Sequence, residues 1–142
     1  MFVGLFLAAA LAGTDAFDAG AVKKAELELK TACGKAVAIT VRWDSFGDDT
    51  DGAQRLMDDG LSFLTASMAS VCADVALAAK LRDGVRSVKL SQAYGAPDPV
   101  IYITQSDLVI EYMWVKGEPA PDSVVVAAEI KSRLNGEEAE AP

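Results

Sequence analysis

The sequence contains no histidine. Histidine is the usual general base at neutral pH and the commonest side-chain ligand of protein-bound metals. A Ser-His-Asp or Cys-His catalytic site therefore cannot be built from this chain alone. The patterns G-x-S-x-G, S-x-x-K, G-x-x-x-x-G-K-[ST] and G-x-G-x-x-G are also missing, so the sequence indicates no serine hydrolase, no nucleotide-binding loop and no cofactor.

Basic residues are also scarce: 13 Lys and Arg stand against 21 Asp and Glu, which gives a formal net charge of −8. A protein that binds nucleic acid or an anionic lipid surface needs a basic patch, and the sequence contains none. We therefore expect no nucleic-acid partner. The single asparagine, Asn135, is not followed by the N-x-[ST] pattern, which excludes N-glycosylation.

The first residues have the pattern of a secretory signal peptide. Residues 2–12 form an apolar run that is too short to span a membrane, and small residues follow at signal-peptidase spacing, with cleavage expected after Ala16. Because no lysine or arginine precedes the run, the alternative is that it forms a buried element of the domain. No later run is long enough for a span. We expect a secreted or periplasmic protein with an extracellular or envelope protein, or a small ligand, as its partner.

The sequence contains two cysteines, Cys33 and Cys72, and both lie beyond the predicted signal peptide. An even count in an exported chain predicts one disulfide between them. The alternative is a pair of buried thiols that pack as small apolar side chains. The spacing is unlike that of redox or zinc motifs.

Apolar periodicity predicts helices and strands along the rest of the chain. Helical patterns cover residues 21–33, 51–72, 74–84 and 122–134, and strand patterns cover residues 36–43, 85–92, 100–104 and 108–114. These segments predict an α+β fold in the order α-β-α(α)-β-β-β-α. We expect about four strands in a mainly antiparallel sheet, its last three strands forming a meander, with three to four helices packed mostly on one face.

Two details of the second helix are also predicted. Asp51 and Gln54 resemble a capping box that begins the helix. Its apolar stripe follows helical spacing through Met57, Leu61, Leu64, Met68, Val71 and Val75. Asp74 is expected to cap the separate short helix that follows. The domain is expected to span residues 17–136, followed by a flexible acidic tail at 137–142.

Carboxylates offer weak candidate sites. Asp49, Asp51 and Asp58 fall at positions of a calcium-binding loop, but a strand precedes them and glycine occupies the first position, so a solvated helix-capping loop is the alternative. Glycosidase chemistry needs two carboxylates that flank a bond. The carboxylates available for it are the pairs Glu26/Glu28 and Asp58/Asp59, and Glu111. A cleft in which two of Asp44, Asp48, Asp49, Asp58 and Glu111 converge would favour a hydrolase. Ser67 and Ser70 are interpreted as packing or solvent-facing hydroxyls.

Aromatic residues at strand ends are the candidates for a binding surface. Trp43 and Trp114 alternate with aliphatic residues, so each fits either the core or a surface, whereas Tyr94 lies in a Pro/Gly loop and is expected to be exposed. The leading hypothesis is a small exported binding module that uses a sheet face or the loop at 93–99. The alternatives are a secreted hydrolase based on carboxylates or a weakly bound cation, and a structural component of an envelope or extracellular assembly.

Overall fold

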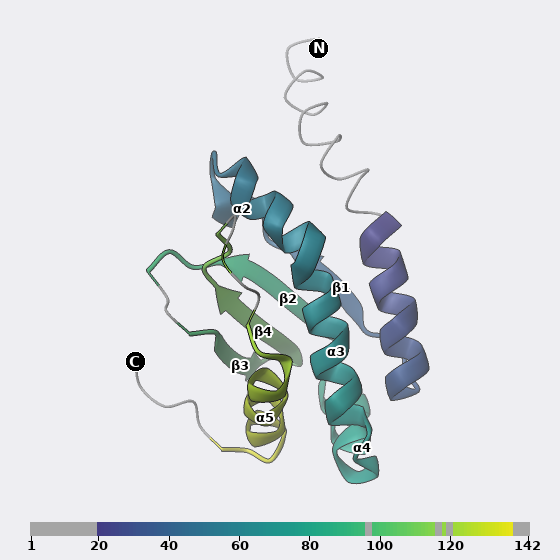
Figure 1. Cartoon of the computed structure of the whole chain (residues 1–142). Coiled ribbons are helices and arrows are strands. Elements are labelled where there is room, and N and C mark those ends of the chain that lie inside the picture. The colour runs from purple at the N-terminus through teal and green to yellow at the C-terminus, as the bar shows by residue number, and fades with distance from the viewer. Residues whose placement is uncertain (1–19, 96–97, 116–117, 119–120, 138–142) are drawn as a thin grey trace.

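The computed structural model describes residues 20–95, 98–115, 118 and 121–137 (Figure 1). Residues 20–33 form a helix, called here the N-terminal helix. The further elements are β1 (Ala38–Val41), the 3-10 helix η1 (Trp43–Phe46), α2 (Thr50–Arg55), the π-helix η2 (Leu56–Gly60), α3 (Leu61–Cys72), α4 (Val75–Gly84), β2 (Ser87–Gln92), β3 (Val100–Thr104), β4 (Asp107–Tyr112) and α5 (Ser123–Leu134). The predicted order of elements is confirmed. The predicted signal peptide at 1–16 and residues 138–142 of the predicted tail lie outside the described residues.

The described strands form one sheet in the order β1-β2-β4-β3. β1 and β2 are parallel, β2 and β4 are parallel, and β3 and β4 are antiparallel. The predicted α+β class and four strands are confirmed, but the expectation of a mainly antiparallel sheet with a three-strand meander was wrong. The connection between β2 and β3 carries the chain past one strand position, and β4 then returns into the gap between β2 and β3.

The turn between β3 and β4 explains that return. Gln105 and Ser106 have positive φ values of 51° and 70°. Two central residues in this conformation match the right-handed twist of a hairpin, so β3 and β4 pair directly. The gap between the predicted strands 100–104 and 108–114 is therefore a tight turn, although Asp107 already belongs to β4.

The helices gather on one side of the sheet, where the N-terminal helix, α3 and α5 lie in front of the strands in Figure 1. The sheet residues on that side are buried against them: Ile39, Val41, Val88, Leu90, Ile101, Leu108 and Ile110. The opposite side carries polar residues of the same strands, such as Thr40, Lys89 and Glu111. This alternation follows from the two-residue period of a strand.

A disulfide joins Cys33 and Cys72, as predicted, with a Cα–Cα distance of 5.2 Å. It ties the last residue of the N-terminal helix to the last residue of α3. Nearby, the Lys35 ammonium donates to the Arg82 carbonyl at 2.6 Å, and Arg82 Nη1 donates to the Cys33 carbonyl at 3.3 Å. The disulfide and these bonds fix the point from which β1 departs.

The helix starts differ from prediction at one place. Asp49, rather than Asp51, caps α2, because its carboxylate accepts the Gly52 amide at 2.8 Å. Gln54 does not return to the cap as in a capping box, since its amide donates to the Asp58 carboxylate at 2.9 Å. A Cβ at Gly52 would lie 2.8 Å from the Trp114 carbonyl oxygen, so only glycine fits this close approach.

Asp74 caps α4, as predicted, and accepts the amides of Ala76 and Leu77 at 2.9 and 3.1 Å. The predicted apolar stripe ends earlier than expected, at Val71, because the chain turns at residues 73–74 between α3 and α4. Val75 is consequently 81% exposed, whereas Met57, Leu61, Leu64, Met68 and Val71 are buried as expected.

Candidate functional site

The groove between the N-terminal helix and strand β1 is the main candidate site. The helix ends at residue 33, and Gly34, with a φ of 75°, donates its amide to the Lys30 carbonyl at 2.9 Å. This left-handed residue terminates the helix and lets the chain reverse. The chain then enters β1, so the helix and the edge strand face each other across the groove.

The groove has a volume of about 500 Å³. Volumes of this order are typical of ligand-binding clefts in proteins, about 300–1,000 Å³. The residues that line it come from the helix, the segment at the start of β1 and the start of β2: Lys23, Glu26, Leu27, Lys30, Ala36, Val37, Ala38 and Arg86. Leu27 is 65% exposed, so a large apolar side chain stands open to the solvent in this wall.

The start of β1 lines the same groove, through Ala36, Val37 and Ala38. The amides of Ala38 and Arg42 donate to carbonyls of the β2 region, at 3.3 and 2.8 Å. Alternate residues of an edge strand therefore direct their backbone groups away from the sheet. Among these, Ile39 donates its amide to the Glu26 carboxylate at 2.9 Å. Glu26 thus occupies a position that a carbonyl oxygen of an added strand would take.

Charge in the groove is opposite to that of the chain. Three of its lining residues are basic, Lys23, Lys30 and Arg86, and Glu26 is the acidic one among them. The whole chain carries a net charge of −8. The groove is therefore a basic region in an acidic protein.

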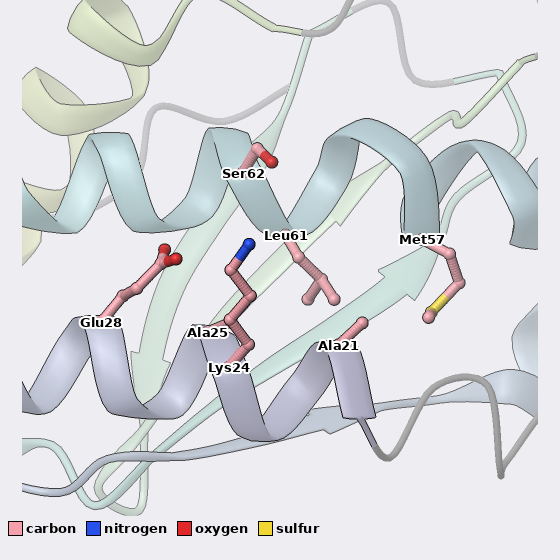
Figure 2. Close-up of a pocket in the computed structure, with 7 residues that line it drawn as sticks. All are labelled: Ala21, Lys24, Ala25, Glu28, Met57, Leu61 and Ser62. Carbon is pink, nitrogen blue, oxygen red and sulfur yellow. The ribbon is translucent and has the colours of Figure 1, made fainter.

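A second, smaller pocket of about 170 Å³ lies on another side of the N-terminal helix, between this helix and α3. Figure 2 shows the Lys24 and Glu28 side chains extending toward α3, and Ser62 of α3 also lines this pocket. The remaining lining residues are apolar: Ala21, Ala25, Met57 and Leu61. Glu26 and Glu28, predicted as a carboxylate pair, consequently face different cavities.

In the described part of the chain, no group of three metal-ligating side chains is brought together. Asp49 caps α2, Asp51 lies exposed in its first turn, and Asp58 bonds to Gln54 in η2. Asp44 pairs with Arg42 at 3.6 Å on the surface, and Asp59 forms an ion pair with Arg55. Asp48, in the turn before α2, is exposed.

Glu111 lies on the face of the sheet opposite the helices, where it accepts the Tyr102 hydroxyl at 2.8 Å. This hydrogen bond, followed by burial of the hydroxyl, raises the pKa of Tyr102. On the same face Asp107 accepts the Ser87 hydroxyl and pairs with the Lys89 ammonium at 3.0 Å. These bonds, that from Ser87 first, lower the pKa of Asp107. The pairs link neighbouring strands.

The three aromatic candidates occupy different environments. Trp114 is 1% exposed and packs with Phe63 and Tyr112 in the core. Trp43 is partly buried and contacts Phe46, with a ring-centroid distance of 5.8 Å. Tyr94 is 62% exposed, and its hydroxyl donates toward the Phe46 carbonyl and the Asp49 carboxylate. Desolvation and then the Asp49 contact raise the pKa of Tyr94. Trp43 and Tyr94 thus reach the surface, whereas Trp114 belongs to the core.

The two candidate serines separate similarly. Ser67 is fully buried and donates to the Phe63 carbonyl at 2.8 Å, which is a packing role, and Ser70 is exposed.

The groove residues were missed by sequence reasoning. Lys23, Glu26, Leu27 and Lys30 follow i, i+3, i+4, i+7 spacing, which marks one helix face.

Within the described residues, no single helix is both long and apolar enough to cross a membrane; Thr50–Cys72 and Val75–Gly84 meet that test only together, as a pair bent by 117°. Comparison of the chain with protein-family models, with curated proteins and with solved structures gives no match.

Proposed function

We propose that the chain is a small exported binding module, secreted or periplasmic, and that its ligand occupies the groove between the N-terminal helix and β1. The observation that carries this proposal is the combination of a volume of about 500 Å³ with an exposed Leu27 in its wall. Protein ligand sites combine such a cavity with apolar contacts and a few convergent polar groups. Lys23, Lys30 and Arg86 supply the polar groups here.

Export is supported by two features of the chain. The apolar run at 2–12, followed by small residues, has the pattern of a signal peptide. The disulfide between Cys33 and Cys72 suits an oxidising compartment, in which such bonds persist.

The binding part of the proposal is tested by magnetic resonance on isotope-labelled protein with its disulfide intact. Titration with a pool of short capped peptides of mixed sequence is expected to shift the amides of Val37 and Ile39. The variant Leu27→Ser should weaken these shifts. Val124→Ser is the matched control, because Val124 is also an exposed aliphatic residue, 72% exposed, but lies on α5. A pool that shifts only residues around Tyr94, or none, overturns the groove as the binding site.

The export part is tested by the intact mass of protein expressed with its own N-terminal segment. Material recovered outside the cytoplasm should begin near Phe17 and contain no thiol that can be alkylated without reduction. A full-length cytosolic protein with two free thiols contradicts export.

A further inference from the structure

We propose that the groove binds an extended acidic peptide segment, which pairs with β1 as a fifth strand and displaces the Glu26 carboxylate from the Ile39 amide. This inference rests on the proposed function and names the chemical class of its ligand. Strand addition at an exposed sheet edge is a recurring mode of peptide recognition, in which backbone bonds supply affinity and side-chain pockets supply specificity.

The edge of β1 is covered in this structure, because Val37, Ile39 and Val41 are only 1%, 7% and 8% exposed. An added strand must therefore displace the side chains that cover it, Glu26 first. Ile39 directs its amide outward, and an oxygen atom of Glu26 already accepts it at 2.9 Å. A peptide carbonyl is also an oxygen acceptor, so it can replace the carboxylate without leaving the buried amide unpaired. Val37 and Val41 have the same register as Ile39 and direct their backbone groups to the same side.

The side-chain environment selects the charge of the peptide. Lys23 and Lys30 are two helical turns apart, which corresponds to roughly 10 Å along the axis. An extended chain covers that distance in about three residues. Carboxylates near both ends of such a segment can therefore approach Lys23 and Lys30, while an apolar residue between them meets Leu27. Arg86 adds positive charge at the start of β2.

Glu26 works against binding of an acidic ligand. While it accepts the Ile39 amide, it fills the edge position and its negative charge opposes an acidic ligand. Once displaced, its carboxylate still lies beside the ligand, so it weakens acidic binding in both states. Removing this charge should strengthen binding of an acidic peptide.

The test uses two capped peptides of equal length, one with glutamate at alternate positions between valines and one with glutamine in place of glutamate. Both are titrated at low salt into the disulfide-bonded protein, with the Ile39 amide as the reporter. The glutamate peptide is expected to bind with a Kd lower by roughly tenfold, because several exposed charge pairs each contribute a few-fold. Raising the ionic strength should reduce this difference.

Charge variants distinguish an effect of the lysines in the groove from an effect of charge elsewhere on the helix. Lys23→Gln and Lys30→Gln should each weaken binding of the glutamate peptide by roughly two- to fivefold and weaken binding of the glutamine peptide less. Lys24→Gln is the matched control, since Lys24 belongs to the same helix but lines the smaller pocket. Glu26→Gln should strengthen binding of the glutamate peptide by a similar factor.

Each outcome has a distinct meaning. Equal affinity for the two peptides, with shifts at Ile39, overturns the acidic class and leaves the groove as a binding site. No shift at Ile39 with these peptides or with the mixed pool overturns both proposals. Shifts at Ile39 that grow with protein concentration alone show that a second copy occupies the edge, which overturns the peptide as the occupant.

Discussion

At the β3 edge of the sheet, Arg133 Nε donates to the Ile101 carbonyl at 3.2 Å, whereas at the β1 edge the Glu26 carboxylate accepts the Ile39 amide at 2.9 Å. Each contact satisfies a backbone group that an edge strand would otherwise offer to another chain. The two edges therefore use side chains of opposite charge for the same task. They differ in what surrounds each side chain.

Arg133 is engaged in several directions. Its side chain is 8% exposed, its Nη1 donates to the Glu137 carbonyl at 2.6 Å, and its Nη2 donates to the Glu129 carboxylate at 2.7 Å. Release of Arg133 would break all of these bonds together. Glu26 instead stands in the wall of an open groove, beside the exposed Leu27. The comparison indicates that Arg133 is held by more bonds than Glu26, although the residues of β1 are the more deeply buried: Ile39 and Val41 are 7% and 8% exposed, whereas Val100 of β3 is 39% exposed.

The largest effect on this comparison is expected from the disulfide, because it holds the N-terminal helix that forms one wall of the β1 groove. Replacing both cysteines by serine should lower the free energy of unfolding by about 4 kcal/mol, from the loop entropy of a bridge that spans a sequence separation of 39. Urea unfolding measures this loss. Hydrogen exchange should also accelerate more at Ile39 than at the amides of β3.

A loss below about 1 kcal/mol would contradict this view of the bridge. Packing of Ala25 and Leu29 in the core would then hold the helix without it. Reduction of the unmodified protein provides the matched control, because it opens the same bond without changing the sequence.

The next largest loss of stability is expected at the β3 edge. Arg133→Met keeps much of the apolar stem and removes the guanidinium, so the unfolding free energy should fall by about 1.5–3 kcal/mol, as for hydrogen bonds of charged groups. Lys131→Met, on the same helix, is the control for loss of a positive charge. If the two variants have equal stability in urea unfolding, the bonds of the Arg133 guanidinium do not stabilise the β3 edge.

A smaller effect is expected at Glu26. Glu26→Ala removes the acceptor of the Ile39 amide, but water can enter the open groove and replace it, so we expect a loss of about 0.5–1.5 kcal/mol. Glu26→Gln keeps a neutral acceptor and should lose less, and Glu28→Ala serves as the control from the same helix. Thermal or urea unfolding gives the stabilities. A loss at Glu26 as large as that at Arg133 would remove the distinction between the edges.

The sequence was sufficient for the elements that line these edges. Alternation at Val37, Ile39 and Val41 predicted β1, and helical spacing through Ala25, Leu29 and Cys33 predicted the helix beside it. Both patterns arise from burial of one face, which leaves a periodic mark along the chain. The bridge between Cys33 and Cys72, predicted from the even cysteine count in an exported chain, is present.

The position of β4 was not predictable in this way. Burial of Leu108 and Ile110 requires a covered face, but it does not specify which strands lie on either side. The groove was missed for a related reason. Lys23, Glu26, Leu27 and Lys30 form a regular helix face that reads as solvent-exposed, and its role depends on the distance between the helix and the edge strand, which no local pattern encodes.

The smallest expected change in stability concerns a group of polar side chains on the two central strands, between the two edge strands. Asp107 pairs with Ser87 and Lys89 across β4 and β2, and its pKa is lowered from the usual value of 3.8. A carboxyl group with a depressed pKa in the folded state stabilises the fold above its unfolded pKa and loses this contribution as the pH falls through the folded value. The stability difference between the unmodified protein and Asp107→Asn should thus be constant above about pH 5 and shrink as the pH falls below about 4. Urea midpoints across this range test it. A difference that persists at pH 2 would show that Asp107 acts by packing or by its uncharged hydrogen bonds rather than by its charge.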